Sequence, residues 1–255
     1  MTTALKIGRS LLFLSDFDGT LTPIVRDPAE AWLPLRVRED LRTLAGSDRV
    51  IVGVVSGRRL DDLRRRVGLS SIIYAGCHGL EISGLGATFR HRSAAARTEG
   101  LADMADELRR RTARLAGVVV EPKGLSVAVH YRNAGSEILG PLSEMVGRVV
   151  SARPGYTLLS GRKVFEILPA GDWDKGRCVE WIEEQVRARG GSATTVYLGD
   201  DATDELAFAA LHGRGITVKV GDGASTRAAC RVQDVDEVHR VLAALADHVA
   251  AGTTP

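Results

Sequence analysis

The chain has 255 residues, of which 44% are hydrophobic and 26% charged, with a formal net charge of +2 at pH 7. This is the composition of a globular protein with room for one large or two modest domains, and the small net charge gives no reason to expect a nucleic-acid partner. The three cysteines have no metal-site spacing, and an odd number favours a reducing compartment over a disulfide framework.

The only strongly apolar run near the start, residues 11–14, is too short for a membrane span, and we expect no cleavable signal before it. Two arginine clusters, at 64–66 and 109–111, lie in predicted helices. We expect each to form the solvent-exposed face of its helix, not a nucleic-acid site. We therefore predict a cytoplasmic protein that is a monomer, with no nucleic-acid and no membrane partner.

The first part of the chain alternates apolar runs with amphipathic segments. The runs at 11–14, 50–55 and 72–76 predict buried strands, and the segments at 37–44 and 60–67 predict the helices between them. Three prolines (Pro23, Pro28 and Pro34) mark a long loop after the first strand. Short crossovers of this kind imply a parallel sheet with right-handed connections.

Around Ser93 the pattern changes to long helices and hairpins. Helices are predicted at 94–115 and 138–150, and hairpins at 118–131 and 156–168, the second turning at Gly161-Arg162. Helices on one face of an antiparallel sheet would make a separate unit. Helices at 175–189, 203–211 and 235–249 and strands at 194–198 and 216–220 then resume the parallel pattern. The fold class is therefore α/β: a Rossmann-like parallel-sheet core, 1–92 and 170–255, with an inserted α/β cap domain, 93–169.

Polar residues follow three core strands and begin one core helix. They are Asp16 and Asp18, Ser56, Lys175, and Asp200 with Asp201 and Asp204. Parallel α/β sheets place their chemistry at the carboxyl ends of the strands. Carboxylates gathered there repel one another unless a cation neutralises them, and Mg²⁺ favours a few carboxylates together with substrate phosphate. Each residue alone has a structural interpretation, such as a turn, a solvated lysine or an N-capped helix start.

The stretch Asp16-Phe17-Asp18-Gly19-Thr20 resembles the nucleophile motif of the haloacid dehalogenase superfamily of phosphatases. The resemblance implies that Asp16 attacks phosphorus to give an aspartyl-phosphate and that Asp18 is the general acid and base. It also implies catalytic roles for Ser56 and Lys175. The implied Mg²⁺ ligands are Asp16, Asp18 and Asp200, and Asp204 would orient these ligands without binding the ion directly. The core residues predicted to bind substrate are Gly19, Thr20, Gly57, Arg58 and His78.

The stretches 74–82, 121–132, 161–169, 173–176 and 215–221 are similar to trehalose-6-phosphate phosphatases. This implies a cap that grips the sugar through Glu121, Lys123, His130, Arg132, Lys163 and Glu166. The alternative is plain cross-strand salt pairing on the cap sheet. One departure is Cys77, where the family commonly has Asn or Ser, and a thiol cannot replace an amide as a hydrogen-bonding group.

We therefore expect a Mg²⁺-dependent phosphatase that hydrolyses trehalose 6-phosphate to trehalose and phosphate. The nearest alternative keeps the chemistry and changes the substrate to sucrose phosphate, mannosylglycerate phosphate or a pseudo-disaccharide phosphate. A non-catalytic sugar-phosphate regulator is a third possibility, against which the intact pair Asp16 and Asp18 argues.

Overall fold

The structure is a computed structural model that describes residues 10–222 and 225–252. The chain divides into two compact units: unit 1 joins the described residues up to Phe89 to those from Trp173 onward, and unit 2 is Arg90–Asp172. Unit 2 thus extends slightly beyond the predicted cap, 93–169, at both ends. That it behaves as an independent domain stays a prediction.

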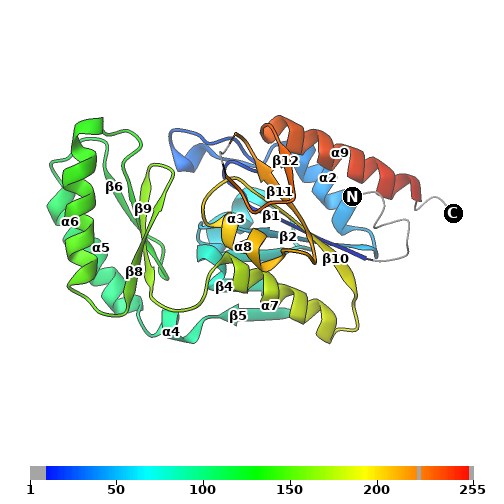
Figure 1. The fold of residues 1–255 in the computed structure, drawn as a ribbon, viewed down its shortest axis with the longest axis horizontal. Coiled ribbons are helices and arrows are strands. Elements are labelled where there is room, and N and C mark those ends of the chain that lie inside the picture. Colours follow the sequence, from blue (N-terminus) through cyan, green and yellow to red (C-terminus); the bar gives the residue numbers. More distant parts are fainter. Residues whose placement is uncertain (1–9, 223–224, 253–255) are drawn as a thin grey trace. The chain divides into compact units, whose positions relative to one another are not determined.

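Unit 1 is built on one sheet in the order β12-β11-β10-β1-β2-β3-β4-β5 (Figure 1). The strands are β1 (Ser10–Ser15), β2 (Val50–Val55), β3 (Ile73–Gly76), β4 (Glu81–Gly84), β5 (Ala87–Arg90), β10 (Ala193–Gly199), β11 (Ile216–Val220) and β12 (Cys230–Val232). The six strands from β12 to β3 are parallel, and β4 runs antiparallel to β3. The central position of β1, with β10 on one side and β2 on the other, fits its apolar run Leu11–Leu14.

Helices cover both faces of this sheet, so unit 1 has three layers. On one face α2 (Leu35–Ala45), α3 (Leu60–Val67) and α9 (Val235–Gly252) enclose the core around Phe13 and Val52, and α2 and α9 lie side by side (Figure 1). On the other face α7 (Lys175–Ala188) and α8 (Asp204–Ala210) pack on Leu14 and Tyr197. Two short 3₁₀ turns, η1 (Pro28–Glu30) and η2 (Cys77–Gly79), follow β1 and β3. The fold class predicted from the sequence is confirmed for this core.

Unit 2 is a four-stranded antiparallel sheet, in the order β6-β7-β9-β8, with helices on one face. Its elements are α4 (Arg92–Ala95), α5 (Thr98–Thr112), β6 (Val119–Pro122), β7 (Val127–His130), η3 (Ser136–Ile138), α6 (Leu139–Ser151), β8 (Tyr156–Gly161) and β9 (Val164–Pro169). The apolar faces of α5 and α6 meet alternate strand residues such as Val127, Val129 and Phe165. The intervening strand residues therefore point to the opposite face of this sheet.

Three local expectations were wrong. The helix predicted at 94–115 is two helices, because the backbone of Arg97, between α4 and α5, departs from helical geometry (φ −110°, ψ 9°). The hairpin of β4 and β5 was not predicted from the sequence. The structure shows that its two-residue turn, Leu85 and Gly86, has positive φ at both positions. The second cap hairpin turns at Arg162-Lys163 instead of Gly161-Arg162, with φ +66° at Lys163.

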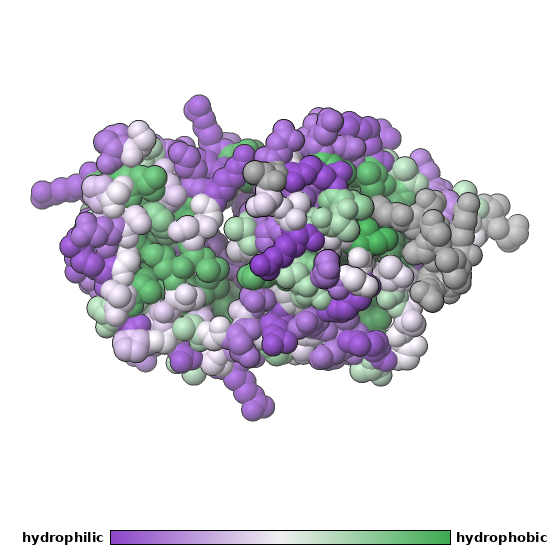
Figure 2. All heavy atoms as spheres, viewed as in Figure 1, coloured by the Kyte–Doolittle hydropathy of each residue, from purple (hydrophilic) through white to green (hydrophobic). Residues whose placement is uncertain are grey.

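Hydrophilic side chains are spread over much of the surface that Figure 2 presents, with apolar ones among them. Within the described residues, no helix is both long enough and apolar enough to cross a membrane.

Candidate active site

Asp16 and Lys175 meet at the carboxyl end of the central strand. Asp16 follows β1, and its amide donates to the carbonyl of Leu198 on the neighbouring strand (2.9 Å). Lys175 begins α7, a helix capped by the Asp174 side chain, which accepts from the amide of Arg177 (3.0 Å). Lys175 Nζ lies 3.1 Å from Asp16 Oδ1 and 2.7 Å from Asp204 Oδ1, and only 2% of the lysine side chain is exposed. A buried ammonium is thus shared by two carboxylates.

Asp204 holds the loop after β10 in place. Its Oδ1 accepts from Lys175 and from the Tyr197 hydroxyl (2.8 Å), while its Oδ2 accepts from the amides of Asp200 (2.9 Å) and Asp201 (3.0 Å). Both oxygens of this fully buried carboxylate are therefore already used within the protein. This arrangement fits a residue that positions its neighbours.

The negative charges in this region outnumber the ammonium of Lys175. Carboxylate oxygens of Asp16, Asp200 and Asp204 all lie within 4.8 Å of one another. Burial raises the pKa of Asp16 well above its usual range, and the neighbouring acids raise it further although Lys175 lowers it. Burial, together with the charges of Asp204 and Asp201, raises the pKa of Asp200 to about 7. A hard divalent cation would relieve this repulsion, so the donor set fits Mg²⁺.

Gly19 gives Asp200 room to approach the first loop. Its φ is +88°, and a Cβ at this position would lie 2.2 Å from Asp200 Oδ2. The Thr20 hydroxyl lies at the outer limit of hydrogen bonding to the same carboxylate (3.5 Å to Oδ1). The glycine that the motif demands is therefore a steric requirement of the acidic cluster.

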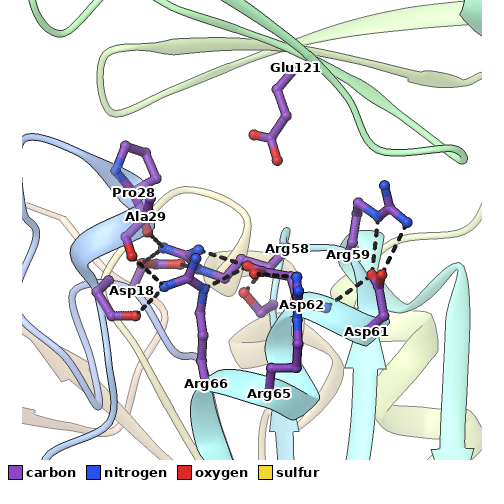
Figure 3. A network of polar contacts seen from close by, with 12 residues as sticks. Asp18, Pro28, Ala29, Arg58, Arg59, Asp61, Asp62, Arg65, Arg66 and Glu121 are labelled. Carbon is purple, nitrogen blue, oxygen red and sulfur yellow. Dashed lines mark hydrogen bonds and ion pairs between the residues drawn. The ribbon is translucent and has the colours of Figure 1, made fainter.

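The Asp18 carboxylate points toward Arg58, in the loop after β2 (Figure 3), and it is not one of the three aspartates that group within 4.8 Å of one another. Its two carboxylate oxygens accept from Arg58, at 2.6 Å from Nε and 2.7 Å from Nη2. The predicted role of Asp18 as a metal ligand therefore has no side-chain support in this conformation, and its role as an acid and base stays a prediction.

Ser56 and His78 lie at neighbouring strand ends. The buried Ser56 hydroxyl accepts from the amide of Arg58 (3.2 Å), and the Ser56 carbonyl accepts from the amide of His78 (2.9 Å). Cys77 and His78 both have positive φ, +47° and +57°, and the amide of Cys77 donates to the carbonyl of Arg58 (2.7 Å). These bonds fix the loop after β3 against the Ser56-Gly57-Arg58 turn. Cys77 itself is fully buried.

The residues predicted to bind the sugar lie in unit 2, and four of them form two side-chain pairs there. Lys123 Nζ lies 3.0 Å from Glu166 Oε1, which also accepts from the Ser126 hydroxyl (2.8 Å), and His130 Nε2 lies 2.8 Å from Glu121 Oε2. Strand register aligns Glu121 with Ala128 and Ala128 with Glu166, so the two glutamates share the sheet face opposite the helices.

The other two predicted sugar ligands lie near the second hairpin turn. Arg132 Nη2 donates to the carbonyl of Arg162 (3.0 Å), and the Lys163 carbonyl accepts from the amide of Tyr131 (3.1 Å). Ion pairs on the cap sheet, the alternative that the sequence left open, are therefore present. They do not exclude sugar binding.

Sequence reasoning missed three contributors to unit 1. Tyr197 bonds Asp204, Lys219 donates to the Asp200 carbonyl from inside β11, and Asp62 binds Arg58 from α3. The available signals were a tyrosine in the predicted strand 194–198 and a lysine in the predicted strand 216–220. Asp62 had no such signal, because an acid in the first turn of a helix is commonplace.

Comparisons with known proteins agree on one family. A family model described as trehalose-phosphatase matches residues 14–236. A trehalose-phosphate phosphatase of Mycobacterium tuberculosis (strain H37Rv) is 40% identical over 216 residues, which are 84% of this chain and 54% of the relative. One of Mycolicibacterium paratuberculosis is 43% identical over 208 residues, 81% of this chain and 52% of the relative. The chain thus spans about half the length of these curated relatives.

Solved structures show the same fold. The crystal structure of a trehalose-6-phosphate phosphatase related protein has a TM-score of 0.83 at 23% identity and covers 95% of this chain and 100% of its own. The C-terminal domain of the Candida albicans trehalose-6-phosphate phosphatase has a TM-score of 0.81, also at 23% identity, covering 96% of this chain and 95% of its own.

Proposed function

Because the chain belongs to the trehalose-phosphatase family, we propose that it hydrolyses trehalose 6-phosphate to trehalose and phosphate. The observation that carries the proposal is the buried cluster of Asp16, Asp200 and Asp204 around Lys175. A nucleophilic carboxylate beside an ammonium and a cation site is what phosphoryl transfer requires.

The residues that would hold Mg²⁺ are Asp16 and Asp200. Asp204 would support them, because it accepts hydrogen bonds from the amides of Asp200 and Asp201. When bound, the cation would neutralise phosphate oxygens and so let the anionic carboxylate approach phosphorus. Lys175 adds a fixed positive charge next to Asp16, since its Nζ lies 3.1 Å from Asp16 Oδ1. Because Lys175 is held by two carboxylates, its ammonium is already oriented before substrate arrives.

In the first step, an oxygen of Asp16 forms a bond to phosphorus while the bond from phosphorus to the sugar oxygen breaks. Asp18 gives its proton to that oxygen, which leaves as a hydroxyl of trehalose. Ser56, at the end of β2, is suited to hold a phosphate oxygen with its hydroxyl.

In the second step, the Asp18 carboxylate takes a proton from water, and the water oxygen bonds to phosphorus. The bond between phosphorus and Asp16 breaks, which releases phosphate and restores both carboxylates. Each aspartate thus ends the cycle in its starting state.

We further propose that unit 2 supplies the selectivity for the sugar. The face of its sheet opposite the helices carries Glu121, Lys123 and Glu166, charged groups that suit a ligand rich in hydroxyls. A core that touches only the phosphoryl group would treat all monoesters alike, so discrimination must come from elsewhere in the protein.

The test is phosphate release in Mg²⁺ from trehalose 6-phosphate, sucrose phosphate, mannosylglycerate phosphate and glucose 6-phosphate. We expect the highest kcat/KM for trehalose 6-phosphate and loss of turnover in excess chelator. Asp16→Asn should retain less than about a hundredth of kcat, a barrier increase of about 2.7 kcal/mol or more. A higher kcat/KM for another sugar phosphate would mean that the protein is a phosphatase of the same mechanism with that sugar phosphate as its substrate. Turnover by Asp16→Asn above that limit would reject the covalent mechanism.

A further inference from the structure

We propose that Arg58, Asp62 and Arg66 form a positioning device for Asp18, so that α3 sets the direction of the acid and base of the proposed phosphatase reaction. The inference rests on the proposed function, since it concerns how Asp18 delivers its proton. It assigns to Asp62 and Arg66, which lie outside the acidic cluster, a role in catalysis through Arg58.

The spacing along the chain brings the three side chains together. Arg58, Asp62 and Arg66 are four residues apart, and Asp62 and Arg66 share one face of α3 (Figure 3). Asp62 Oδ2 accepts from both flanking arginines, at 3.0 Å from Arg58 Nη1 and 2.7 Å from Arg66 Nε. This one oxygen of Asp62 therefore joins the guanidinium groups of Arg58 and Arg66, while its Oδ1 accepts from the exposed Arg65 (3.3 Å).

Arg58 is almost fully committed within the protein. It donates through Nε and Nη2 to Asp18, through Nη1 to Asp62 and again through Nη2 to the carbonyl of Pro28 (2.8 Å). Four of its five N–H groups thus have acceptors already. Its side chain is 11% exposed. These commitments favour a positioning role over the direct substrate contact that the sequence predicted.

Arg66 fastens this arrangement to the loop after β1. Its Nη1 donates to the carbonyls of Ala29 (3.0 Å) and Ala31 (2.8 Å), and its guanidinium lies 5.1 Å from the ring centre of Trp32. The side chain of Arg66 is 9% exposed. The loop that starts from the Asp16–Asp18 motif is therefore held by Arg58 at Pro28 and by Arg66 of α3 at Ala29 and Ala31, so α3, the loop and Asp18 are connected through hydrogen bonds.

The consequence for the chemistry lies in the two-point contact of Arg58 with Asp18. Two parallel N–H donors fix the plane of a carboxylate, whereas one donor leaves it free to rotate. When Asp18 gives up its proton to the leaving oxygen it becomes an anion, and the guanidinium is already in place to stabilise it. Without Asp62, the guanidinium of Arg58 loses the acceptor of Nη1 and keeps only the Pro28 carbonyl to orient it against Asp18.

The experiment measures kcat/KM in Mg²⁺ for phenyl phosphate and 4-nitrophenyl phosphate, esters of similar size with leaving groups of very different basicity. Phenolate needs a proton from Asp18 far more than nitrophenolate does. Asp62→Asn should therefore lose about tenfold or more in kcat/KM on phenyl phosphate relative to its loss on 4-nitrophenyl phosphate. A merely structural role would lower both rates equally.

Asp61→Asn is the matched control, because Asp61 is the adjacent acid of the same helix and binds Arg59 instead (Figure 3). It should leave both rates within about twofold of wild type. Equal losses on the two esters in Asp62→Asn, or no loss, would overturn the proposal. If Asp62→Asn does not fold, as judged by circular dichroism, Arg66→Lys takes its place. Its loss in kcat/KM on phenyl phosphate relative to that on 4-nitrophenyl phosphate then supports or overturns the proposal by the same criterion. Failure of the wild type to release phosphate from trehalose 6-phosphate in the same buffer would instead refute the proposed function.

Discussion

Replacing Lys175 with methionine tests the electrostatics of the acidic cluster without touching its carboxylates. Methionine has nearly the length of lysine but no charge, so Asp16 and Asp204 lose the ammonium that lies 3.1 and 2.7 Å away. Breaking a buried ion pair by removing one partner typically costs about 3–5 kcal/mol. We expect a loss of that size in the free energy of unfolding of the metal-free protein at pH 8.

The loss of unfolding free energy in Lys175→Met should depend on pH, and the ionisation of the carboxylates determines whether it grows or shrinks as pH rises. Burial raises the pKa of Asp16 already in the wild type, and removal of Lys175 takes away the charge that lowers it. The folded variant therefore binds a proton that the unfolded chain, with an aspartate pKa of about 3.9, does not bind near neutral pH. Its stability then falls as pH rises from about 4 through the raised pKa of Asp16, so the loss is smaller at pH 5 than at pH 8.

The assay is urea unfolding in chelator at the two pH values, followed by circular dichroism. Arg42→Met is the control, because Arg42 forms an ion pair with Glu39 in which both side chains are more than half exposed, and it should change stability by less than about 0.5 kcal/mol. A loss below about 1 kcal/mol for Lys175→Met at pH 8, or an equal loss at both pH values, would refute this account of the cluster.

Three further outcomes are expected. Mg²⁺ should raise the melting temperature more at pH 8 than at pH 6, because Asp200, with a pKa of about 7, must release its proton to bind a cation; equal gains would contradict this. Gly19→Ala should lower kcat at least about tenfold, since its Cβ would meet Asp200, while Gly86→Ala, a positive-φ glycine with open space around it, should keep wild-type kcat. Glu166→Gln should lower kcat/KM for trehalose 6-phosphate about tenfold to a hundredfold and leave 4-nitrophenyl phosphate hydrolysis nearly unchanged; equal losses on both would make Glu166 structural.

The amino-acid sequence by itself determined the core of the fold and the positions of the acids along it. Apolar runs such as 11–14 and 50–55 have the length and composition of buried parallel strands, and β1 and β2 lie there. Asp174, a residue type that favours helix starts, directly precedes the helix at Lys175, and its side chain caps α7. These features are local, because hydrophobic periodicity and capping depend on neighbours within a few residues.

Only the tertiary structure decided how those side chains are directed. The carboxylate of Asp18 is bound at two points by Arg58, forty residues away, a contact that no motif in the sequence indicated. The Tyr156 hydroxyl donates to the carbonyl of Arg97, at the junction where one predicted helix divides into α4 and α5. Lys123 and Glu166 become partners because β7 and β9 pair and bring the two hairpins together. Such contacts join residues about forty to sixty positions apart, and no local pattern encodes them, since each depends on how strands and helices pack against one another.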